Sequence, residues 1–234
     1  MNTLYKIEGV KRMKKIWFSL IIGFLMTTAL FGSAEEKLLD SSNALKNMMR
    51  DSKIKIPQKV LEHAQAIAIF PGTIEISMFL GGKTGNGVMV VRRNDGSWSY
   101  PFFVKLGGAG FGFQLGVEKK DILMILQSKD SVQKLMNNKI TLGVDASVAA
   151  GPAGDSVGRG SESDFNSEVY TYTKTQGAFV GVSFDGSVMN HDYDQNIELY
   201  GNNITPAQII ASDGLLSSYA IEEFLKAVQK LTSY

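Results

Sequence analysis

The stretch KLGGAGFGFQLG, residues 105–116, places a glycine at every second position from Gly108 to Gly112 and large apolar residues around them. A period of two is that of a β-strand. A dinucleotide-binding turn instead needs glycines at fixed offsets between a strand and a helix. The stretch therefore predicts a strand in a sheet, with glycines that let a neighbour approach closely or let the strand bend.

A second glycine-rich stretch, GGKTG at 81–85, carries the Gly-Lys-Thr of a phosphate-binding loop. Such a loop needs a glycine five residues before Gly82, and Ser77 stands there instead. We therefore expect no nucleotide site. The stretch is interpreted as a flexible loop that presents Lys83.

Further segments with strand-like patterns surround these two stretches. The turn NDGS at 94–97 predicts a β-hairpin. Residues 121–128 fit a strand or a helix by periodicity, and we interpret them as a strand. The expected strands cover 66–70, 73–79, 87–93, 98–116, 121–128, 140–150, 168–174 and 177–184.

Helical patterns lie mostly at the two ends of the chain. Expected helices cover 35–51, a short segment from Pro57, residues 129–138 with Asp130 or Ser131 as cap, a turn from Pro206, and 219–231. Strands in series between terminal helices predict an α+β fold. We expect one domain, residues 35–234, with an antiparallel sheet, barrel-like or open, flanked by the N- and C-terminal helices.

The N-terminal 34 residues have the layout of a secretory signal peptide. Four basic residues at 11–15 precede an apolar run of about sixteen residues that ends in Gly-Ser-Ala, which predicts cleavage after Ala34. The alternative is a membrane anchor, although a helix needs about 20 residues to cross a bilayer. Translation can begin at Met1 or at Met13. We expect an exported protein, periplasmic or secreted.

Composition excludes several classes of function. Removal of residues 1–34 changes the formal net charge from +1 to about −3, which argues against nucleic-acid binding. The absence of cysteine excludes disulfides, thiolate metal sites and cysteine nucleophiles. The fold must therefore be stable without covalent cross-links.

The sequence contains no recognisable catalytic or metal-binding motif. Its histidines, His63 and His191, have no partner at metal-ligand spacing. The segment from Asp192 begins like a calcium-binding EF-hand loop but lacks the glycine and the final glutamate, so we expect Asp192 to cap a helix. Acidic residues in the glycine- and serine-rich segment 151–165 (Asp155, Glu162 and Asp164) are the alternative calcium ligands, although acidic loops are usually only solvated. We expect no enzyme, no cofactor and no metal.

Seven motifs in order resemble the SYLF-domain family. They are AIAIFPG, GGKTGNGVMVVR, GSWSYPFFVKLGGAGFGFQLG, DILMILQS, LGVDASVAAGPAG, YTYTKTQGAFVGVSFDGS and DQNIELYG, and they cover most of residues 38–231. The resemblance implies phospholipid binding, actin binding in eukaryotic members, and no catalysis. A signal peptide would make this chain a bacterial exported member, so the lipid activity transfers more readily than the actin activity.

A basic segment is the candidate lipid-binding site. Residues 46–59 hold five basic residues against one acidic residue, Asp51. Such a cluster orients a protein on an anionic membrane. The predicted lipid-binding residues are Lys46, Arg50, Lys53, Lys55, Lys59 and Lys83, and Leu45, Met48 and Met49 are candidates for apolar insertion unless they belong to the core.

Three functions remain open from the sequence. The first is a phospholipid-binding protein peripheral to an envelope membrane. The second is a protein-interaction or structural component of the envelope, whose partner the sequence does not identify. The third, a hydrolase that uses serine or carboxylate groups of the 151–165 loop, is the weakest because no base lies near a nucleophile.

Overall fold

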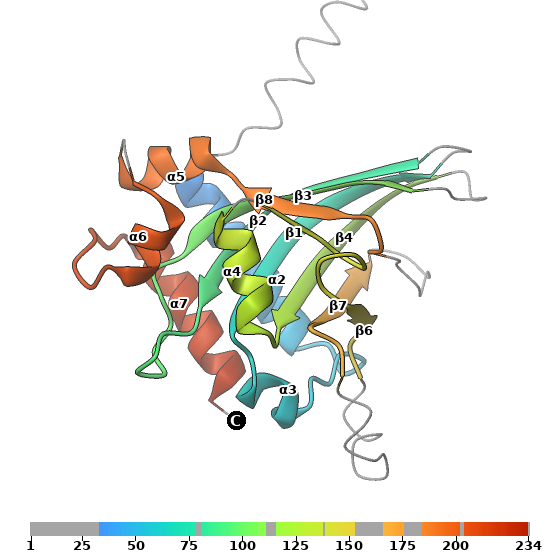
Figure 1. The fold of residues 1–234 in the computed structure, drawn as a ribbon, viewed down its shortest axis with the longest axis horizontal. Coiled ribbons are helices and arrows are strands. Elements are labelled where there is room, and N and C mark those ends of the chain that lie inside the picture. The colour runs from blue at the N-terminus through green and yellow to red at the C-terminus, as the bar shows by residue number, and fades with distance from the viewer. Residues whose placement is uncertain are drawn as a thin grey trace, which may run out of the picture. The chain divides into compact units, whose positions relative to one another are not determined.

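The computed structural model describes residues 33–77, 81–110, 116–137, 139–152, 166–175, 184–201 and 204–233 (Figure 1). The expected apolar leader, most of the 151–165 loop, and the strand at 177–184 up to Ser183 lie outside these residues. From Ala34 onward the chain belongs to one compact unit. No helix in the described ranges is long and apolar enough to cross a bilayer.

A curled eight-stranded sheet forms the centre of the described fold (Figure 1). The strands lie in the order β5-β8-β3-β2-β1-β4-β7-β6. They are β1 (Ala66–Ser77), β2 (Gly81–Val91), β3 (Phe102–Gly110), β4 (Gly116–Leu126), β5 (Lys139–Thr141), β6 (Val148–Ala150), β7 (Val169–Thr175) and β8 (Val188–His191). The predicted α+β class with helices at both ends is confirmed.

The sheet is mixed rather than wholly antiparallel. Every neighbouring pair of strands is antiparallel except β6 and β7, which run parallel. Parallel neighbours need a long connection, because the chain must return to the end of the sheet at which the first strand began. The segment between Ala150 and Val169 is that connection, and its length allows the parallel pairing.

Apolar cores lie on both faces of the sheet, because alternate residues of the central strands point to opposite sides. On one face, Ile67, Ile69 and Val88 pack with α2 (Ala34–Met49), α3 (Gln58–Glu62) and α7 (Tyr219–Thr232). We call this the α2/α7 face. On the other, Ala68, Phe70 and Met89 pack with α4 (Lys129–Asn137) and α6 (Pro206–Ala211), and we call it the α4 face.

The terminal helices α2 and α7 pack against each other on their shared face of the sheet. The predicted apolar stripe of α2 is fully buried at Leu38, Leu45 and Met48. The Ser42 hydroxyl donates a hydrogen bond of 3.0 Å to the Glu223 carbonyl of α7. The first and last helices of the described fold therefore form one layer, and the sequence patterns predict each of these helices separately.

The predicted helix starts are confirmed at three places. Pro57 is the N-cap of α3. Asp192 caps α5 (Tyr193–Tyr200) by accepting a hydrogen bond from the Gln195 N–H, and α6 starts at Pro206. The cap of α4 differs from the prediction: the Ser131 N–H donates to the Ser128 hydroxyl at 3.3 Å, so the cap is neither Asp130 nor Ser131.

Several predicted strand boundaries were wrong. The expected strand 98–116 is shorter, since β3 covers Phe102–Gly110 and Gly116 already begins β4. Residues 66–77 form one strand with a bulge near Gly72, whose positive φ of 56° suits glycine. The stretch 81–85 is the start of β2 and not a loop. Residues 140–150 are two short strands, β5 and β6, because the chain turns at Gly143 and the Asp145 carboxylate accepts the Thr141 N–H at 2.7 Å.

Candidate functional site

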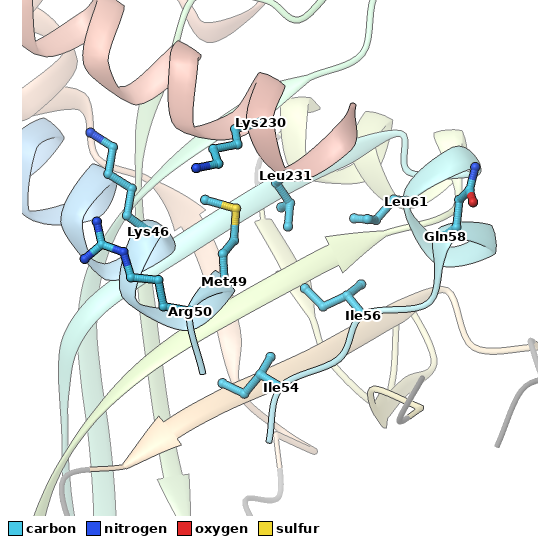
Figure 2. A pocket seen from close by; sticks show the side chains of 9 residues that line it. All are labelled: Lys46, Met49, Arg50, Ile54, Ile56, Gln58, Leu61, Lys230 and Leu231. Carbon is cyan, nitrogen blue, oxygen red and sulfur yellow. The ribbon is translucent and has the colours of Figure 1, made fainter. Parts of the chain in front are cut away.

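A groove of about 630 Å³ opens beside the C-terminal end of α2 (Figure 2). Three parts of the chain line it: α2 with the segment that follows, α3, and the last turn of α7. The lining residues are Lys46, Met49, Arg50, Ile54, Ile56, Gln58, Leu61, Lys230 and Leu231. The groove therefore combines the first and last helices of the described fold.

The segment between α2 and α3 turns apolar side chains toward the groove. A turn follows α2, in which the Ile54 N–H donates to the Asp51 carbonyl at 3.0 Å. Beyond it, Ile54 and Ile56 are partly buried, whereas Lys53 and Lys55 are exposed. An extended chain alternates its side chains between two sides. One side thus carries isoleucines for the groove and the other carries lysines for solvent.

The carboxylate of Asp51 fixes the start of this segment. It accepts the Lys53 N–H at 3.0 Å and lies 3.2 Å from the Lys174 ammonium of β7. The Lys53 N–H and the Lys174 ammonium lower the pKa of Asp51, in that order of importance. The single acidic residue of the basic segment is therefore engaged with β7 at the point where α2 ends.

The floor of the groove is apolar. Leu61 and Leu231 are 6% and 4% exposed and belong to the core of the α2/α7 face. Met49, Ile54 and Ile56 are partly buried and pack against that core. An apolar chain that entered the groove would continue the contacts of an existing core.

Cationic side chains gather at one end of the groove, where Figure 2 shows Lys46, Arg50 and Lys230 on the same side of the apolar residues. Arg50 and Lys230 are exposed. The Lys46 ammonium lies 2.7 Å from the Glu223 carboxylate of α7. That contact lowers the pKa of Glu223. The groove thus has an apolar body and a basic rim.

The predicted lipid-binding residues fall into three groups in the structure. Lys46 and Arg50 line the groove. Lys53, Lys55 and Lys59 flank it on the connecting segment and α3. Lys83 lies on β2. The interaction of these residues with lipid stays a prediction.

Lys83 points to the α4 face of the sheet, opposite the groove. Its position on β2 has the same parity as Met89, and its ammonium lies 4.5 Å from the centre of the Phe184 ring. Burial lowers the pKa of Lys83, with a partial opposing effect of Glu75. The structure therefore does not bring Lys83 together with the basic segment, because the expected flexible loop is a strand.

A cluster of three charged residues, Lys120, Glu75 and Glu118, also lies on the α4 face. The side chain of Lys120 on β4 is only 3% exposed. Its ammonium lies 3.0 Å from the Glu75 carboxylate and 2.7 Å from the Glu118 carboxylate. Burial lowers the pKa of Lys120, but hydrogen bonds to Glu118 and Glu75 outweigh it and raise the pKa overall. The two carboxylates offset the cost of burying the Lys120 ammonium on this face of the sheet.

The apolar insertion candidates are largely committed to the fold. Leu45 and Met48 have no exposed surface and pack in the core of the α2/α7 face. Met49 lines the groove. Sequence reasoning missed Ile54, Ile56 and Lys230. The alternation of isoleucine and lysine at 53–56 was a signal for the first two, whereas Lys230 reaches the groove only through the packing of α7 on α2.

Histidines and acidic residues show no metal cluster in the described ranges, where no group of three or more such side chains is placed to hold an ion. The His63 Nδ1 lies 2.8 Å from the Lys59 carbonyl oxygen on the surface. His191 is buried against the rings of Phe102 and Tyr193. The acidic residues considered for calcium at 155–164 lie outside the described ranges.

The described fold is of the α+β class: a curled sheet is covered on one face by its first and last helices, α2 and α7. Comparison with known families identifies the family. Residues 107–231, more than half of the chain, match the Ysc84 family, described as "Las17-binding protein actin regulator". The chain belongs to this family. The resemblance to the SYLF-domain family is therefore confirmed.

Relatives of this chain come from fungi and mammals. It is 38% identical over 159 residues to an SH3 domain-containing protein of Schizosaccharomyces pombe and 36% identical over 159 residues to the protein YSC84 of Saccharomyces cerevisiae. It is 31% identical over 159 residues to the human SH3 domain-containing YSC84-like protein 1. These matches cover 67%, 67% and 68% of this chain but 37%, 34% and 46% of the relatives. The chain thus matches less than half the length of each of them.

Proposed function

We propose that this protein is a non-enzymatic module that binds anionic phospholipid at a membrane surface. The observation that carries the proposal is the groove, in which Lys46, Arg50 and Lys230 stand beside an apolar floor. A phospholipid offers the complementary pair of groups, a phosphate and a hydrocarbon chain. The export predicted from residues 1–34 supports an envelope membrane, on its periplasmic or outer side, as the place of action.

The expected strength of attachment is moderate. Each basic side chain near an anionic surface contributes about 1 kcal/mol. The three rim cations and the flanking Lys53, Lys55 and Lys59 therefore give a few kcal/mol, which salt weakens. Apolar contact with the groove adds about 25 cal/mol for each Å² buried.

A protein partner is the second candidate function. One relative carries the name "LAS seventeen-binding protein 3", and the family is described as "Las17-binding protein actin regulator"; both describe interactions with proteins. A protein surface with acidic and apolar residues would also complement the groove. Binding to actin by this chain would require that it reach a host cytoplasm. Lipid dependence separates the two candidates.

Vesicle flotation tests the proposal. We expect the chain from Glu35 to float with vesicles of phosphatidylglycerol and phosphatidylcholine and to stay in solution with phosphatidylcholine alone. The double variant Arg50→Glu and Lys230→Glu should lower the bound fraction by at least about tenfold. The control Lys129→Glu and Lys139→Glu makes the same charge change at exposed positions on α4 and β5 and should bind like the parent. Equal binding by the parent and the groove variant would contradict the proposal.

A further inference from the structure

We propose that the groove takes a single hydrocarbon chain of an anionic lipid and holds its phosphate at the basic rim. The inference rests on the proposed function for the class of ligand, but goes beyond it: the protein would bind one lipid molecule rather than only touch a charged surface. The layout of the groove supports this occupant. Its cations gather at one end and its apolar residues extend away from them (Figure 2).

The size and depth of the groove fit a small amphiphile. Its volume of about 630 Å³ lies within the range of about 300–1,000 Å³ that is typical of small-molecule sites. Leu61 and Leu231 in its floor are almost fully buried, so the cavity reaches down to the core. Attachment to a membrane by charge alone needs exposed cations and no such cavity. The apolar depth is therefore the feature that electrostatic adsorption leaves unexplained.

Of the three cations at the rim, Arg50 and Lys230 are the expected ligands of the phosphate. Glu223 already engages Lys46 at 2.7 Å. Arg50, the residue after α2, and Lys230 of α7 are exposed and line the groove. A guanidinium binds phosphate through two parallel hydrogen bonds, and an ammonium adds a point charge. A phosphate between Arg50 and Lys230 would place its ester chain along Met49 and Ile56.

Soluble alkyl phosphates test this arrangement without a membrane. Hexyl, octyl and decyl phosphate are titrated by calorimetry below their critical micelle concentrations. Inorganic phosphate and octanol are the controls that carry only the phosphate or only the hydrocarbon chain. We expect one ligand for each protein and a Kd that falls about fourfold for each added methylene, because each buried methylene contributes a constant increment. Inorganic phosphate and octanol should each bind at least about tenfold more weakly than octyl phosphate.

Variants locate the chain in the groove. The double change Ile54→Ser and Ile56→Ser should weaken decyl phosphate at least about tenfold and flatten the dependence on chain length. The control Val144→Ser and Leu216→Ser alters exposed apolar side chains elsewhere and should change neither. Circular dichroism melts check that both variants fold, and the chain-length series on the parent protein gives a result even if one does not.

The outcomes separate this inference from the proposed function. Several ligands for each chain, no dependence on chain length, or equal weakening by both double variants would overturn the single-chain site. Flotation with anionic vesicles but no binding of alkyl phosphates would overturn it and leave surface binding intact. Binding of alkyl phosphates without flotation would support the site and contradict the membrane role.

Discussion

The Lys46 ammonium of α2 lies 2.7 Å from the Glu223 carboxylate of α7, and this contact joins the first and last described helices at the rim of the groove. The same cation lines the groove beside Arg50 and Lys230. Glu223 also lies 3.4 Å from Lys226 on its own helix. Glu223 therefore competes with an anionic lipid for Lys46.

Removal of this carboxylate should strengthen membrane binding. Glu223→Gln leaves Lys46 without its anionic partner, and one recovered charge near the surface increases vesicle binding by up to about fivefold. The ion pair is partly exposed, so its loss should reduce the stability of the fold only slightly. Flotation at low salt and urea unfolding measure the two effects. Glu222→Gln makes the same charge change at an exposed neighbour on α7, and an equal gain there would point to net charge rather than to the pair.

A glycine on β2 should not tolerate a side chain. A Cβ at Gly87 would lie 2.6 Å from the Ile69 carbonyl oxygen of β1 and against the Phe70 ring. Gly87→Ala should therefore reduce the free energy of unfolding by about 1–3 kcal/mol through overpacking. Gly107→Ala on β3 is the control, since a Cβ there meets nothing within 4 Å. Urea unfolding compares them, and equal stability of the two variants would contradict the close approach.

The role of these glycines shows what sequence reasoning reached and what it did not. The period of two in 108–112 correctly predicted a strand as far as Gly110, and the close neighbour of Gly108 is Ser187, whose Cα would lie 3.2 Å from an added Cβ. The same abundance of glycine made 81–85 resemble a loop, because glycine weakens the local signal for a strand. Pairing with β1 and β3 supplies the stabilisation that the local sequence lacks.

The sequence predicted only part of the candidate site. Lys46 and Arg50 were found because charge clusters are local features. The apolar stripe of α2 was also visible, but burial of Leu45 and Met48 depends on packing with the sheet and α7. Lys230 is far from Lys46 and Arg50 in the sequence. It reaches the rim only because α7 packs on α2, and a local sequence pattern cannot predict that packing.

Burial of His191 predicts a loss of stability in mild acid. Burial lowers the pKa of His191, and backbone groups of Leu135 and Met136 partly oppose that effect. Above pH 6.5 the imidazole is neutral in the folded and unfolded states and contributes no pH dependence. Below it the unfolded chain binds the proton more readily, so stability falls from pH 6.5 toward the lowered pKa, by up to about 1.4 kcal/mol for each pH unit.

Urea unfolding between pH 7.5 and 5 checks this share of the pH dependence. His191→Gln should show a shallower decrease than the parent, even if the variant is less stable at every pH. His63→Gln at an exposed position should keep the slope of the parent. Parallel curves for the parent and His191→Gln would assign the acid sensitivity to the carboxylates instead.

Charge reversal of the flanking lysines tests the membrane-facing side of the groove. Lys53 and Lys55 are exposed on the segment whose isoleucines line the groove, and Lys59 follows on α3. The triple variant with glutamate at all three positions should lose flotation with anionic vesicles at about 50 mM salt. At about 500 mM salt the parent and the variant should converge, because the screening length falls to a few Å and apolar contact is what remains.

Lys83→Gln is measured in the same experiment, because Lys83 was predicted from the sequence yet lies on the opposite face of the sheet. A single flat membrane cannot meet both faces at once, so flotation of Lys83→Gln should equal that of the parent. A loss in Lys83→Gln together with full binding by the triple variant would move the membrane contact to the α4 face. If the triple variant folds and floats as well as the parent at both salt concentrations, the lysines in 53–59 do not contribute to membrane attraction. Attachment would then depend on the rim of the groove alone.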